Sequence, residues 1–275
     1  MINLKIRIWD GITAEMTNGF EPYLETYILS GDKKRGAVLI CPGGGYAYTS
    51  AREAEPIAMQ FTAKGCHAFV LYYRTAPNRH PKPLLDLSRA MCILRQNSDK
   101  WNIDRNKIAV CGFSAGAHLA ASLGVNFDRP YLETEGINIG ENRPDAMILA
   151  YPVISMKEFF HKGSRENLLG PDADKSLIEE MSPETRVSEK TPPAFIWHTV
   201  EDRSVPVENS LMFAWALQKY KIPFELHIYP YGPHGLALAN KETDNGNIGV
   251  YPHVSGWIDL CIEWLDGLFS GNGKF

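Results

Sequence analysis

A serine flanked by glycines is the strongest chemical signal in the chain. Residues 112–116 read Gly-Phe-Ser-Ala-Gly, which fits the pattern G-x-S-x-G. The apolar run at 107–111 predicts a strand before it, and the small residues at 115–124 predict a helix after it. The glycines allow a sharp turn that lifts the Ser114 hydroxyl off the sheet, above the unpaired N–H groups of the helix start. We interpret Ser114 as a nucleophile; the alternative is a glycine-rich helix start capped by a serine.

A serine nucleophile needs a base, and the base needs a carboxylate that orients it. When the nucleophile lies on such a turn, the acid and then the histidine follow it along the chain. Asp202 follows the apolar run at 194–200, and His234 lies in a loop rich in proline and glycine after the next apolar run. We assign Asp202 as the orienting acid and His234 as the base, with Glu201 and His253 as the rival candidates.

Three consecutive glycines, at 43–45, follow the apolar run at 37–41. Glycine lets backbone N–H groups approach a ligand closely, and one such donor to an oxyanion typically stabilises the transition state by about 2.7–4 kcal/mol. We assign an oxyanion hole to the N–H groups of Gly44, Gly45 and Ala115. A phosphate cradle is the rival interpretation, although neither G-x-G-x-x-G nor a Walker loop is present. A plain flexible turn is the third.

Short apolar runs alternate with amphipathic helices along most of the chain. Strands are predicted at 2–9, 23–29, 37–41, 67–72, 107–111, 146–151, 194–200 and 224–229. Helices are predicted at 51–64, 84–96, 115–124 and 252–268. This alternation predicts an α/β fold, with a mostly parallel central sheet covered by helices on both faces. The first two runs, with turn residues between them, predict an antiparallel entry to that sheet. We expect one domain spanning 1–275.

The stretch at 155–193 interrupts the alternation, because it is polar and lacks an apolar strand. A long insertion in a compact domain usually serves function. We therefore expect a small cap over the site, the alternative being an exposed surface excursion.

Composition and charge exclude several function classes. The formal net charge is −4, and the longest basic cluster is only residues 33–35, so we expect no nucleic-acid partner. Five scattered cysteines without a C-x-x-C pair favour buried thiols over a zinc site or a disulfide framework. They are Cys41, Cys66, Cys92, Cys111 and Cys261. The first residues lack the apolar stretch of a signal peptide, and no run of about 18 apolar residues occurs, so we expect a cytoplasmic protein without a membrane partner.

From residue 36 onward the three chemical segments, in their order, resemble the α/β-hydrolase superfamily. More narrowly, they are similar to bacterial esterases related to acetyl-xylan esterases, feruloyl-esterase-like carboxylesterases and hormone-sensitive-lipase-type enzymes. The resemblance is carried by C-P-G-G-G-Y-A, by the segment ending in G-F-S-A-G-A-H, and by the H-T-V-E-D-R-S-V-P run. Two positions depart from the family pattern: Pro42 replaces a histidine that generally supports the glycine loop, and Ala117 replaces a glycine.

The resemblance implies that Ser114, Asp202 and His234 are the nucleophile, acid and base of an α/β-hydrolase fold. It further implies a carboxylic ester hydrolase that needs no metal or organic cofactor and acts on short acyl esters such as acetylated sugars. The alternatives are a small amidase or formamidase, a peptidase on the same residues, and a non-catalytic binding module. Association of identical copies is compatible with this sequence.

Overall fold

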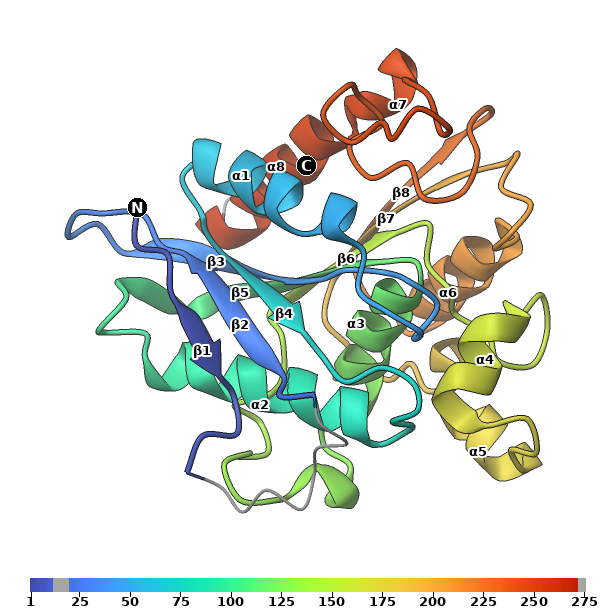
Figure 1. Ribbon diagram of the computed structural model, residues 1–275, viewed down its shortest axis with the longest axis horizontal. Helices are drawn as coiled ribbons and strands as arrows, with labels where there is room; N and C mark the ends of the chain where they lie inside the picture. Colours follow the sequence, from blue (N-terminus) through green and yellow to red (C-terminus); the bar gives the residue numbers. More distant parts are fainter. Residues whose placement is uncertain (12–19, 272–275) are drawn as a thin grey trace.

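The computed structural model describes residues 1–11 and 20–271, and within them eight strands form one sheet (Figure 1). The strands are β1 (Lys5–Arg7), β2 (Tyr23–Tyr27), β3 (Arg35–Cys41), β4 (His67–Tyr72), β5 (Ile103–Phe113), β6 (Ala146–Ala150), β7 (Ala194–Thr199) and β8 (Phe224–Tyr229). Their order across the sheet is β1-β2-β4-β3-β5-β6-β7-β8. β1, β2 and β4 pair antiparallel, and every neighbouring pair from β4 to β8 is parallel.

This topology confirms the predicted mostly parallel sheet with an antiparallel entry. The turn expected between the first two strands falls largely on residues 12–19, which lie outside the described residues.

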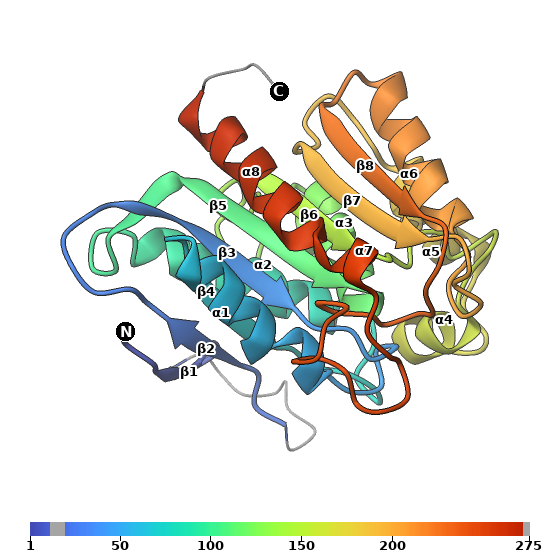
Figure 2. The ribbon, with the colours of Figure 1, turned by 90° about the horizontal axis from the view of Figure 1, so that it is seen from above.

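Helices cover both faces of the sheet, as Figures 1 and 2 show. The α-helices are α1 (Glu55–Ala63), α2 (Lys82–Gln96), α3 (Ala115–Asn126), α4 (Lys162–Leu169), α5 (Lys175–Glu180), α6 (Glu208–Lys219), α7 (Pro252–Ser255) and α8 (Trp257–Ser270). Short 3-10 turns occupy η1 (Ala51–Glu53), η2 (Pro130–Leu132) and η3 (Pro183–Thr185). α1 and α8 pack on one face of the sheet, and α2, α3 and α6 pack on the other.

The central strands are apolar throughout because both of their faces are buried. In β3, Leu39 and Cys41 join the core under α2 and α3, whereas Val38 and Ile40 join the core under α1 and α8. All five cysteines are buried, as predicted. The sheet is therefore a rigid platform between two apolar layers.

Some boundaries differ from the predicted ones. The helix expected at 51–64 is the turn η1 followed by α1, which begins near Pro56 because proline fits only the first helical turn. The segment at 155–193 contains α4, α5 and η3, and α4 lies at the edge toward which the parallel strands point (Figure 2). Among the described residues, none of the helices combines the length and apolarity required to span a bilayer.

Candidate active site

Ser114 occupies the turn between β5 and α3. Its backbone has φ +53° and ψ −117°, a combination that is sterically costly for a residue with a side chain and typical of functional turns. A Cβ atom at Gly112 would collide with the backbone of Ala117, and one at Gly116 would collide with the carbonyl of Cys41. Glycine is therefore required on both sides of the serine, which is the physical reason for the G-x-S-x-G pattern.

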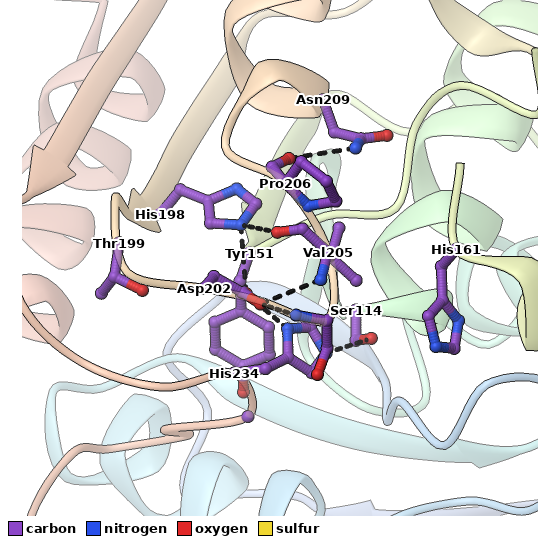
Figure 3. Close-up of polar contacts among 12 residues, drawn as sticks. Ser114, Tyr151, His161, His198, Thr199, Asp202, Val205, Pro206, Asn209 and His234 are labelled. Carbon is purple, nitrogen blue, oxygen red and sulfur yellow. Dashed lines mark hydrogen bonds and ion pairs between the residues drawn. The ribbon is translucent and has the colours of Figure 1, made fainter. Parts of the chain in front are cut away.

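His234 and Asp202 reach Ser114 from the loops that follow β8 and β7. The Ser114 Oγ lies 2.7 Å from His234 Nε2, and His234 Nδ1 lies 2.5 Å from Asp202 Oδ2 (Figure 3). The three side chains singled out in the sequence thus form one continuous hydrogen-bonded row. In such a row the histidine can accept the serine proton, and the carboxylate can stabilise the imidazolium that results.

Asp202 accepts hydrogen bonds from several groups besides His234. Its Oδ1 accepts the N–H groups of Ser204 and Val205, each at 2.9 Å, and the side chain is buried. Burial by itself would raise the pKa of the Asp202 carboxyl. Hydrogen bonds from His198 and His234 outweigh that effect and hold the pKa well below its usual range, so the group is an anion at neutral pH.

His198 is a supporting residue whose position within a strand gives no sequence signal of its role. This buried imidazole on β7 contacts Asp202 Oδ2 at 3.2 Å and the Val205 carbonyl at 3.0 Å through Nε2. Its Nδ1 lies 2.8 Å from the Ser210 hydroxyl. Because both partners of Nε2 are acceptors, Nε2 carries the ring proton and donates a hydrogen bond to Asp202.

The glycine loop after β3 supplies backbone donors beside Ser114. Gly44 and Gly45 have φ values of +126° and +62°, and Asn167 on α4 donates to the Gly45 carbonyl at 2.8 Å. Within residues 1–11 and 20–271, the N–H groups of Gly44, Gly45 and Ala115 have no protein acceptor. These donors are therefore open to a ligand, and their assignment to an oxyanion hole remains a prediction.

A pocket of about 770 Å³ opens over these groups. Ser114 and His234 line it together with the glycine loop and with residues from distant segments. Besides Ser114 and His234, the polar, uncharged members of the lining are Tyr48, Thr49, Ser50, His161, Asn167, Ser204 and Asn245. Arg52 and Glu53 are the charged members. Such a lining suits an uncharged ligand with several hydroxyl groups.

His161 is a second histidine near the site, and its sequence context shows no pattern that indicates a role. It precedes α4 as the N-cap residue, and its Nδ1 accepts the Ser164 N–H at 3.2 Å. Burial lowers the pKa of His161, which favours the neutral ring with its proton on Nε2. Figure 3 shows His161 across Ser114 from His234, and both histidines line the pocket. A capping role carries almost no sequence signal when histidine performs it.

The rival candidates lie elsewhere. Glu201 Oε2 accepts the Gly232 N–H at 3.1 Å, so it holds the loop of His234 without touching the ring. His253 packs edge-on against Tyr229, and His118 hydrogen bonds to the Tyr46 hydroxyl at 2.8 Å. Five aromatic or basic side chains from the segments around the site do not line the pocket. They are Tyr46, Tyr72, Tyr73, Arg74 and Trp197, of which all but Tyr72 are fully buried.

Comparison with known proteins supports the resemblance inferred from the motifs. The profile of the BD-FAE family matches residues 24–217. The chain belongs to the BD-FAE family. Among solved structures, the acetyl ester-xyloside bifunctional hydrolase from Caldicellulosiruptor lactoaceticus has a TM-score of 0.88 and 43% sequence identity, with 96% of each chain covered. An α/β hydrolase from a deep-sea metagenome library has a TM-score of 0.76 and 35% identity, covering 98% of each chain. The predicted α/β-hydrolase fold is therefore confirmed.

Two curated relatives of this BD-FAE chain are much longer proteins. The endo-1,4-beta-xylanase B of Butyrivibrio fibrisolvens is 43% identical over 84% of this chain, but the match covers 37% of that protein. The acetylxylan esterase of Xylanibacter ruminicola is 36% identical over 74% of this chain and 41% of that protein. The chain thus spans about two fifths of the length of each.

Proposed function

We propose that this chain is a serine hydrolase that cleaves short acyl esters, above all acetyl esters, of sugars or related alcohols. The observation that carries the proposal is the row from Ser114 through His234 to Asp202, which opens on a pocket beside three backbone N–H groups without acceptors. The names of the acetyl ester hydrolases among its relatives support the substrate class.

In the proposed mechanism, Ser114 Oγ attacks the acyl carbon while His234 Nε2 takes the hydroxyl proton. The carbonyl oxygen becomes an oxyanion, which the N–H groups of Gly44, Gly45 and Ala115 stabilise. His234 then returns the proton to the leaving alcohol as the C–O bond breaks and an acyl-serine remains. Water, deprotonated by His234, attacks the acyl carbon; the bond to Ser114 Oγ breaks, His234 returns the proton to Oγ, and the carboxylic acid leaves.

The segment at 155–193 is proposed to act as a small cap within a single 1–275 domain. His161, the N-cap residue of α4, and Asn167, in the second half of that helix, contribute to the pocket wall. The neutral His161 ring offers an N–H donor, and the amide of Asn167 anchors the cap to the glycine loop. The cap would therefore recognise polar atoms of the substrate while fixing one oxyanion donor. A cytoplasmic location is part of the proposal, because five buried free thiols suit a reducing compartment.

Hydrolysis of para-nitrophenyl acetate, butyrate and octanoate, measured beside acetylated xylo-oligosaccharides, tests the proposal. We expect rapid release of acetate by the wild type and none above background by Ser114→Ala. Equal rates for the two proteins on every ester would refute it. A small-amide hydrolase is the second candidate, because the same row can cleave amides; the relative rates on an ester and its matching amide separate the two. Labelling of Ser114 by a fluorophosphonate distinguishes either enzyme from a binding module.

A further inference from the structure

A buried carboxylate, Glu53, lies beside the proposed oxyanion hole and has no part in the mechanism above. Glu53 is 3% exposed and belongs to the turn η1. Its Oε2 accepts the N–H of Gly43 at 2.7 Å, and its Oε1 accepts the hydroxyl of Tyr151 at 2.6 Å. The carboxylate therefore fixes the first residue of the glycine loop and a side chain that follows β6.

Tyr151 continues this connection to the loop of His234. Its hydroxyl oxygen accepts the N–H of Ala237 at 3.0 Å, and its ring packs edge-on against the His234 ring at 5.1 Å between centroids. Tyr151 is 2% exposed and adopts φ +36°, a conformation that a bulky residue rarely keeps without functional reason. Glu53 and Tyr151 thus link the two loops whose relative position determines the geometry at Ser114.

The hydrogen-bond pattern fits the ionised form of Glu53. An anionic carboxylate accepts from both Gly43 and Tyr151, and the Tyr151 oxygen remains free to accept from Ala237. A protonated Glu53 would donate to the Tyr151 oxygen and leave the phenolic proton without an acceptor. Burial raises the pKa of Glu53 above its ordinary value, and the hydrogen bonds from Tyr151 and Gly43 and the charges of His234 and Arg52 offset only part of that rise. The two donors that face the carboxylate, rather than its pKa, identify the anion.

The carboxylate also lies close to the nucleophile. A Cβ atom at Gly43 would come within 2.8 Å of Glu53 Oε2 and 3.1 Å of Ser114 Cβ. Only glycine fits between them, so a displacement of Glu53 would be transmitted directly to the backbone beside Ser114.

We propose that Glu53 and Tyr151 are positioning residues. Through one buried anion, they fix the position of the glycine loop at residues 43–45 relative to the loop of His234. The proposal rests on the proposed function, because it concerns the rate of the reaction at Ser114. Neither residue touches the substrate in this role. Each acts through backbone groups, of Gly43 on one side and Ala237 on the other.

Tyr151→Phe tests the hydrogen bonds without removing the ring. We expect kcat for para-nitrophenyl acetate to fall by about ten- to hundredfold with little change in KM, because small displacements at a reacting centre cost rates of this size. Tyr229→Phe is the matched control. The Tyr229 hydroxyl is buried and has no hydrogen-bond partner among the residues that the structure describes, and its ring packs against Trp197 as that of Tyr151 does. The control should keep the wild-type kcat.

Glu53→Gln tests the charge while keeping the shape, with exposed Glu55→Gln as its control. Asp202 and Ser114 hydrogen bond to the two ring nitrogens of His234, and the Tyr151 ring packs against the imidazole. Arg52 donates to the carbonyl of the next residue, Gly235. Glu53 and His161 interact with the His234 charge at longer range. Removal of the Glu53 anion disfavours the imidazolium, so the acid limb of kcat/KM should move to lower pH. A purely structural role would lower stability without moving this limb.

Three outcomes are decisive when ester turnover and fluorophosphonate labelling of Ser114 are measured on folded protein, as judged by circular dichroism. Slow turnover and slow labelling by Tyr151→Phe and Glu53→Gln, with normal controls, would support the proposal. Wild-type rates and an unmoved acid limb in both variants would overturn it and leave the proposed function intact. A wild-type protein as inert as Ser114→Ala in both assays would overturn the proposed function and this inference together.

Discussion

His198 Nε2 donates a hydrogen bond, at 3.2 Å, to the same Asp202 oxygen that accepts the hydrogen bond of His234 Nδ1. With His234 and the N–H groups of Ser204 and Val205, it gives the carboxylate four donors. Asp202 therefore cannot rotate without breaking several hydrogen bonds, and the orientation that it imposes on His234 is fixed before substrate arrives.

We expect His198→Phe to lower kcat/KM for a short acyl ester by about tenfold, since a hydrogen bond to a charged group contributes about 1.5–3 kcal/mol. His198→Gln is the matched control, because its amide can place an N–H near the position of Nε2. Steady-state kinetics of the two variants provide the comparison. Equal losses in both would show that the imidazole acts by packing rather than by donating to Asp202.

Loss of the Asp202 carboxylate should lower the activity far more than loss of the neighbouring Glu201 carboxylate. Asp202→Asn leaves the shape intact but favours the wrong tautomer of His234, and we expect kcat to fall by about 10⁴-fold, the loss that this exchange causes in serine-protease triads. Glu201→Gln retains an oxygen acceptor for the Gly232 N–H and should keep most of the activity. If Glu201→Gln were the inactive variant, the assignment of the acid would be reversed.

Asp202 should also make stability depend on pH. Its folded-state pKa is lowered, so the stabilisation is fully present above the ordinary aspartate pKa of about 3.9 and is lost as pH falls further through the folded-state pKa. The melting temperature of Asp202→Asn should therefore lie furthest below that of the wild type near neutral pH, and the gap should narrow below about pH 4. A gap that stays constant over this range would contradict the ionised state of Asp202.

Sequence patterns predicted those parts of the site that depend on local structure. Ser114 lies at a sharp turn between a strand and a helix. Gly112 and Gly116 must be glycine because a Cβ atom at either position would collide with neighbouring backbone. Asp202 and His234 follow β7 and β8, so the parallel sheet brings them to the same edge. The fold class followed from the alternation of apolar strands and helices.

The supporting residues could not be predicted, because their partners are distant in sequence. The Glu53–Tyr151 hydrogen bond joins residues 98 positions apart. His198 lies within a strand whose pattern marks it as buried without indicating its partner. His161 caps a helix in a polar stretch that has no apolar strand. Each depends on tertiary contacts that neither periodicity nor motif spacing reports.

Arg74 and Asp86 form a fully buried ion pair, and neither residue lines the pocket. Asp86 accepts from the Arg74 guanidinium and backbone N–H, and from the Trp9 indole at 2.7 Å. Asp86→Ala removes the carboxylate that faces a fully buried guanidinium, so we expect a loss of about 3–5 kcal/mol in unfolding free energy. Exposed Asp99→Asn should leave the denaturation midpoint unchanged. Equal midpoints for Asp86→Ala and wild type would show that water replaces the carboxylate.

His161→Asn separates capping from substrate recognition at one position. Asparagine is a strong N-cap residue and can accept the Ser164 N–H, so α4 should form and the melting temperature should stay near that of the wild type. The shorter side chain withdraws the N–H donor from the pocket. Because para-nitrophenyl acetate lacks the hydroxyl groups of a sugar, its kcat/KM should change little, while that for an acetylated xylo-oligosaccharide should fall several-fold. His161→Ala removes both functions and should also lower the melting temperature. If the ratio of kcat/KM for the two substrates were unchanged in His161→Asn, the sugar would bind away from this histidine, and His161 would have only its capping role.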